Sequence, residues 1–154
     1  MKIYTIEQTQ TIRATAEECW AFFSNPANLA RITPPHVDFR ILSEPLPPTV
    51  HEGQMIHYRV KPLAGIPMNW ASEITRVRAP ECFVDEQRAG PYAMWRHEHG
   101  FRDIGGGRME IRDHVQYALP LGFIGRAVHA LVVEQQLKRI FDYREKAAAE
   151  IFGS

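Results

Sequence analysis

Histidine and aspartate side chains recur at alternate positions in the second half of the chain, a spacing that can bring acid–base groups together. His97 and His99 are two residues apart, and Asp113 lies in the next segment of β-strand character. Alternate residues of a strand point to the same face, so both histidines share a face with Trp95 and Phe101. A histidine beside a carboxylate can act as a general base. The pattern therefore predicts acid–base groups on the apolar, inward face of a sheet.

A three-glycine turn at 105–107 joins these two segments and restricts how they pair. A slip of one residue would exchange the faces of a strand, so apolar residues must stay opposite apolar residues. The two registers that satisfy this condition place Asp113 opposite His99 or opposite His97, depending on which glycine lies at the centre of the turn. In both registers we expect an inward carboxylate to contact an inward imidazole.

A third segment repeats the polar stripe, because Phe83, Asp85 and Gln87 alternate along it and share a face. Tyr117 shares a face with Asp113 on its own strand. Charged and amide side chains are rarely buried without partners, so this lining predicts either an internal hydrogen-bond network or a ligand. The residues that we expect to line a ligand site are Trp70, Phe83, Asp85, Gln87, Trp95, His97, His99, Phe101, Asp113 and Tyr117.

Three interpretations of this stripe are open at this point. The first is a satisfied network that stiffens the sheet, and the second is a pocket whose polar end orients an amphipathic ligand. The third, which we favour least, is catalysis: a His–Asp pair as base and Tyr117 as proton donor, in cyclisation or dehydration of a polyketide-like substrate. Nucleophile elbows, Walker loops and GxGxxG motifs are absent from the sequence, so hydrolase, phosphoryl-transfer and dinucleotide chemistry have no support.

A metal site is a further possibility, because His97, His99 and a cross-strand aspartate could supply three ligands. A His-x-His pattern on a strand arises often by chance. We therefore expect no metal and no other cofactor.

The composition is that of one ordinary globular domain. The 154 residues are 45% hydrophobic and 23% charged, and 18 basic side chains balance 18 acidic ones. A chain of this length buries enough surface for a core without metals or disulfides. We expect a single domain over 1–154 and no nucleic-acid partner, because phosphate binding needs a clustered basic surface.

Two cysteines are too few for a disulfide framework, and the N-terminal residues contain no apolar run of the kind that a signal peptide needs. The longest apolar stretch, 127–133, is interrupted by His129 and is far shorter than a membrane span. We expect a cytoplasmic protein that does not insert into membranes.

Turn signals divide the chain into α and β segments. Thr15 and Glu18 form a capping box for a first helix, which should end at Asn25 because Pro26 disfavours helix in the residue before it. After Pro120 proline is absent and helix-favouring residues dominate. The expected elements are a strand over 2–12, this first helix, a short helix over 26–31, six strands over 37–117 and a long helix over 121–152.

Several phrases of the sequence, spread over nearly the whole chain, resemble a known superfamily. They are FFSNPANL at 22–29, ITPP at 32–35, FVDEQ at 83–87, GPY at 90–92, WRHEH at 95–99 and DHVQYALP at 113–120. They resemble the START-related, polyketide-cyclase and lipid-transport proteins (SRPBCC), most closely a bacterial ligand-binding subgroup, some of which are labelled cell-division inhibitors. The resemblance implies an α+β helix-grip fold: a curved seven-stranded antiparallel sheet around a long C-terminal helix, with two short helices between the first two strands.

The same resemblance implies a deep cavity for an apolar ligand and no metal, but no particular reaction, because fold alone does not set function. We expect the chain to bind a small hydrophobic or amphipathic molecule, lipid- or polyketide-like, between the sheet and the C-terminal helix. The alternative is a cofactor-free cyclase or dehydratase that uses the same cavity. A protein-interaction module would need an apolar outer face. The outward residues are instead polar: Arg96, Glu98, Arg108, Glu110, Arg112 and Gln116.

Overall fold

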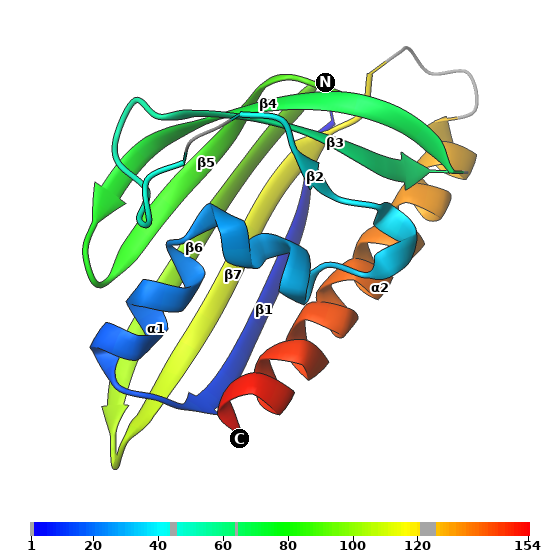
Figure 1. Cartoon of the computed structure of the whole chain (residues 1–154). Helices are drawn as coiled ribbons and strands as arrows, with labels where there is room; N and C mark the ends of the chain where they lie inside the picture. The colour runs from blue at the N-terminus through cyan, green and yellow to red at the C-terminus, as the bar shows by residue number, and fades with distance from the viewer. Residues whose placement is uncertain (1, 44–45, 64, 121–125) are drawn as a thin grey trace.

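The computed structural model describes residues 2–43, 46–63, 65–120 and 126–154. Seven strands form one antiparallel sheet in the order β1-β7-β6-β5-β4-β3-β2, so the first strand pairs with the last. The short helices and the long C-terminal helix lie on the same side of this sheet (Figure 1). The strands are β1 Tyr4–Arg13, β2 Arg40–Ile41, β3 Met55–Leu63, β4 Ile66–Arg78, β5 Cys82–Ala89, β6 Met94–Gly105 and β7 Arg108–Ala118.

The capping box forms as expected and starts helix α1, Ala16–Phe23. The Thr15 hydroxyl accepts from the backbone N–H of Glu18, and the Glu18 carboxylate accepts from the backbone N–H of Thr15. A 3₁₀ helix, η1, follows over Pro26–Ile32, with Asn25 capping its first turn. Figure 1 shows these two elements across the lower part of the sheet, and their buried residues include Cys19, Phe22, Phe23 and Ile32.

The segment after η1 differs from the expectation of continuous β structure from residue 37. A second 3₁₀ turn, η2, covers Pro35–Val37, and β2 comprises two residues only. The reason is local: the proline ring presets the φ that the first residue of a helical turn requires. Val37 is therefore buried from a turn rather than from a strand.

The register of β6 and β7 decides which polar groups meet. The turn lies at Gly106–Gly107, between the paired residues Gly105 and Arg108, and a register shift between Asp103 and Gly105 precedes it. Beyond that shift His99 lies opposite Asp113 and Phe101 opposite Ile111. This is one of the two registers expected from apolar alternation. All three turn glycines have positive φ values, between 65° and 83°, a region that side-chain-bearing residues rarely adopt. Side chains on β6 alternate between buried and partly exposed from Met94 to Phe101.

Helix α2, Arg126–Phe152, packs against β1, β3 and η1. The expected first residues of this helix, 121–125, lie outside the described residues. Its buried face follows helical periodicity and comprises Val133, Leu137, Phe141, Arg144, Ala147 and Ala148. Within the described chain, no helix has the length and apolar character needed to cross a membrane.

Candidate functional site

Two adjoining cavities lie between the covered face of the sheet, η1 and α2. The larger has a volume of about 150 Å³, and the smaller has about 70 Å³. Aromatic side chains from several strands and loops wall the larger one, among them Trp70, Trp95 and Tyr92. The residues common to both cavities are Leu29, Ile32, Phe39, Tyr58, Asp85, His99 and Arg144. The charged groups among them therefore lie where the two cavities meet.

Two histidine–aspartate hydrogen bonds form at this junction, and neither joins two residues that lie directly opposite each other in the sheet. His99 lies opposite Asp113 and His97 opposite Asp85 in the backbone pairing. The hydrogen bonds run diagonally instead: His97 Nε2 to Asp113 Oδ1 at 2.8 Å and His99 Nε2 to Asp85 Oδ2 at 2.6 Å. The two imidazole rings stack with their centroids 3.6 Å apart. Each carboxylate thus orients the histidine diagonal to it and not the histidine with which its backbone is paired.

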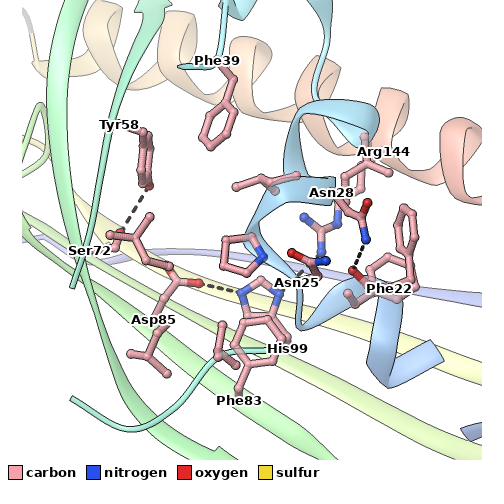
Figure 2. A pocket seen from close by; sticks show the side chains of 17 residues that line it. Phe22, Asn25, Asn28, Phe39, Tyr58, Ser72, Phe83, Asp85, His99 and Arg144 are labelled. Carbon is pink, nitrogen blue, oxygen red and sulfur yellow. Dashed lines mark hydrogen bonds and ion pairs between the residues drawn. The ribbon is translucent and has the colours of Figure 1, made fainter. Parts of the chain in front are cut away.

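Arg144 joins this cluster from α2 and is missing from the residues expected from the sequence. Its Nη2 lies 3.5 Å from Asp113 Oδ1 and 3.5 Å from His99 Nδ1. The residue is only 7% exposed, and Figure 2 shows its side chain extending from the helix toward His99. The sequence could have indicated it, because Arg144 follows Phe141 by three residues and so lies on the same, apolar face of α2.

The electrostatics of the cluster keep both aspartates ionised and His99 neutral near neutral pH. Burial alone would raise the pKa of Asp113, but Arg144 and the two histidines hold it well below its usual value. Burial likewise opposes the ionisation of Asp85, but the hydrogen bond from His99, together with the charges of the two histidines and Arg144, outweighs it and lowers the pKa of Asp85. Burial, followed by the charge of His97, lowers the pKa of His99 to about 4. The neutral His99 therefore donates from Nε2 to Asp85 and presents its Nδ1 lone pair to Arg144.

The cluster contains residue types that bind metals, since Asp85, His97 and His99 offer ligand atoms within 4.8 Å of one another. Their orientation does not suit a shared ion. The two rings stack with centroids 3.6 Å apart and planes 25° from parallel, so their in-plane lone pairs lie in separate, nearly parallel planes and cannot both point at one ion. The nearby guanidinium of Arg144 would also repel a metal cation. The geometry fits two hydrogen-bonded pairs better than a resident metal.

Comparison with solved structures identifies the architecture. An aromatase/cyclase from a Streptomyces species superposes with a TM-score of 0.70 at 19% identity, covering 97% of this chain and 96% of that chain. A START superfamily protein from Mycobacterium smegmatis gives 0.70 at 11% identity, with 96% and 98% covered. This chain has the helix-grip fold. Norcoclaurine synthase from Thalictrum flavum, solved with dopamine and hydroxybenzaldehyde, gives 0.61 at 14% identity, with 97% and 88% covered.

The structural neighbours of this helix-grip chain are SRPBCC proteins over nearly their full length. The expected fold, with seven antiparallel strands, a long C-terminal helix and short helices between β1 and β2, is confirmed. No protein-family model and no curated protein matches the sequence. At these identities the likeness concerns the fold, and function must be argued from the cavity itself.

Six of the ten residues expected to line a ligand site line one or both of the two cavities. They are Trp70, Phe83, Asp85, Trp95, His97 and His99. Phe83 stacks on the His99 ring at 4.1 Å between centroids, so it fixes the imidazole from the side opposite His97. The role of these side chains in binding stays a prediction.

The other four expected residues lie outside both cavity linings. Asp113 is buried and acts through the bond to His97. Tyr117 is 2% exposed and stacks on Tyr4, and Phe101 packs in the apolar cluster around Phe23. Gln87 closes the loop after β5 instead: its Nε2 donates to the carbonyl of Tyr92, and its Oε1 accepts from the N–H of Tyr92.

Tyr58 is a second cavity residue that sequence reasoning missed. Its hydroxyl lies 3.2 Å from Ser72 Oγ, and both cavities contact it. Burial, and then the charge of Asp85, raise the pKa of this phenol, so it stays protonated and able to donate (Figure 2). The alternation of Tyr58 with Val60 on β3 is the signal that could have placed it inward.

Proposed function

We propose that this chain binds a small hydrophobic or amphipathic molecule in the cavities between its sheet and α2. The observation that carries the proposal is the combination of aromatic walls with a charged, hydrogen-bonded cluster at the junction of the two cavities. Ligand sites in proteins typically combine apolar walls with a few convergent polar groups. An apolar cavity of about 150 Å³ accommodates a benzene-sized molecule. The two cavities together would suit one aromatic ring with a short substituent, such as a polyketide or lipid fragment.

The fold family is consistent with this proposal, because its members bind hydrophobic ligands or act as cyclases. Among the described residues, a surface hollow of about 630 Å³ lies apart from the two cavities, and half of the side chains that line it are charged, among them Arg102, Glu110 and Arg112. Side chains on the outer face pair with one another, as Arg112 Nη2 does with Glu7 Oε1 at 2.8 Å and Arg102 Nη2 with Glu110 Oε1 at 3.1 Å.

The test is native against denaturing mass spectrometry of protein purified from its host without added ligand. We expect an additional mass of about 100–200 Da, that of one aromatic ring with a short substituent, which is lost on denaturation. Val133 is buried against the larger cavity, and Val132 beside it is 43% exposed. The variant Val133→Phe should reduce the retained mass, and Val132→Phe should leave it unchanged. A mass that both variants retain equally would place the ligand elsewhere and contradict the proposal.

A second candidate function is cofactor-free acid–base catalysis in the same cavity, of the cyclase or dehydratase type. The observation that favours it is His99, a neutral imidazole oriented by Asp85 and exposed to both cavities. Tyr58, unlike Tyr117, lines both cavities, and it would be the proton donor. If this chemistry operates, His99→Ala abolishes turnover of a polyketide-like substrate and leaves its binding intact. Equal loss of binding and turnover would favour binding alone.

A further inference from the structure

We propose that the ligand carries a protonated amine beside its apolar part, and that this ammonium group pairs with the carboxylate of Asp85. This inference rests on the proposed function, because it names the chemical class of the molecule that the cavity binds. It is argued from the charges around the cavity junction, the aromatic walls and the available volume.

The two buried aspartates differ in how their charges are balanced. Asp113 has the Arg144 guanidinium at 3.5 Å and the hydrogen bond from His97 at 2.8 Å. Asp85 accepts from His99 at 2.6 Å, and across the described chain no lysine or arginine nitrogen lies within 4.0 Å of it. With His99 neutral, the hydrogen bond to Asp85 brings no charge. Arg144, the one lysine or arginine among the described residues that line the two cavities, lies within 4.0 Å of Asp113 and not of Asp85, so Asp85 is the carboxylate without a close guanidinium or ammonium partner.

His97 is the group that could balance Asp85 from within the protein, and its geometry is poor for that role. Its Nε2 is committed to Asp113, and its Nδ1 is 4.0 Å from Asp85 Oδ2, beyond hydrogen-bonding distance. A carboxylate removed from water without a close cation is costly, and the cost falls when a ligand supplies the cation. Asp85 contacts both cavities, so a ligand in either one reaches it.

The walls around Asp85 suit a cation as well as an apolar group. Trp70, Trp95 and Tyr92 contact one another as a cluster of rings, with centroid separations of 5.3 Å for Trp70–Trp95 and 4.9 Å for Tyr92–Trp95. Tyr58 stacks on Trp70 at 5.6 Å. Ring faces attract ammonium groups, with tryptophan the strongest. Arg144 is the one cation of this lining and is held by Asp113. An anionic ligand would lie beside the carboxylate of Asp85 and be repelled.

The experiment compares three one-ring probes of similar size: phenethylamine, 2-phenylethanol and 3-phenylpropionate. Their binding to the wild-type protein is measured by calorimetry near neutral pH. A charge-assisted contact gives about 10-fold or more in affinity, so we expect the amine to bind at least about 10-fold more tightly than the alcohol. The carboxylate should bind most weakly. No variant is needed for this comparison, so it does not depend on folding of a mutant.

Two variants test whether Asp85 causes the preference for the amine. Asp85→Asn should lower amine affinity by about 10-fold or more and change alcohol affinity by less than about 3-fold. Glu86→Gln, the next residue on β5 and on its opposite face, should change neither. Equal binding of amine and alcohol, or an amine preference that survives Asp85→Asn, overturns the inference and leaves the proposed cavity function standing. If none of the three probes binds, both proposals fail.

Discussion

Removal of the Arg144 charge is the perturbation whose consequence follows most directly from the structure. The variant Arg144→Met keeps most of the apolar stem of this 7% exposed side chain and deletes the guanidinium. Asp113 then loses its only cationic partner among the described residues, although the His97 hydrogen bond remains. We expect a clear loss of stability, because the buried carboxylate stays ionised without compensation or must take up a proton.

The magnitude can be worked from the separation of the two groups. At the observed 3.5 Å between Nη2 and Oδ1, Coulomb attraction at an effective dielectric constant of about 20 is about 5 kcal/mol. Breaking a buried ion pair from one side typically costs about 3–5 kcal/mol of unfolding free energy. For a chain of this length that loss lowers the melting temperature by about 6–20 °C.

The assay is urea and thermal unfolding of four proteins: wild type, Arg144→Met, Asp113→Asn and the double variant. Because the double variant has no orphaned charge, it should be less destabilised than the sum of the two single variants. Arg139→Met, an exposed position on the same helix, is the matched control and should change stability little. A loss below about 1 kcal/mol for Arg144→Met, with no coupling to Asp113, would refute the reasoning.

Three further results are expected. Since the pKa of His99 is about 4 in the folded state and about 6.5 when unfolded, the unfolded state binds the proton first. Stability should therefore fall by about 3 kcal/mol as pH decreases from 6.5 to 4. In urea titrations at several pH values, His99→Gln should lose this pH dependence of stability, and the outward-facing His114→Gln should keep it. The same dependence of unfolding free energy on pH in wild type and His99→Gln would contradict a buried, neutral His99. Gly90→Ala places a Cβ 2.7 Å from Gln87 Oε1. The two hydrogen bonds between Gln87 and Tyr92 should then break, and thermal unfolding should show a loss of about 1–2 kcal/mol of unfolding free energy. An unchanged melting temperature would contradict this role of Gln87. Thr15→Ala should cost about 1 kcal/mol by removing the α1 cap, and Thr15→Ser should not; equal effects of both would rule out the capping role.

Much of the fold could be predicted because short sequence patterns specify where helices begin and where strands turn, and the structure follows them. The capping box at Thr15, the glycine turn at 105–107 and the proline-free C-terminal segment each act within a few residues. Apolar alternation then limited the β6–β7 pairing to two registers, and the observed one places His99 opposite Asp113. Strand was expected from Val37 up to the turn signal at Pro45, but over the described residues 37–43 the chain has the end of a 3₁₀ turn and a strand of two residues.

The site was predicted less completely, because side-chain direction does not specify side-chain partners. Alternation placed the histidines and aspartates on one face, but the diagonal bonds depend on rotamers and on the twist between strands. Arg144 comes from an element far away in sequence, and its place against the sheet depends on how α2 packs. Gln87 satisfies its amide within its own loop, a local solution that strand alternation alone does not reveal.

The measurement that tests the cavity function most directly is the location of a neutral one-ring probe in crystals of the protein. A crystal soaked with 4-bromophenol reports the position of the bromine by anomalous scattering, without assuming any charge preference. We predict bromine density between the sheet and α2, in contact with the lining around Trp95 and His99, and no such density in Val133→Phe. Bromine found only on the outer surface, or density at the same place in Val133→Phe at equal occupancy, would contradict the account.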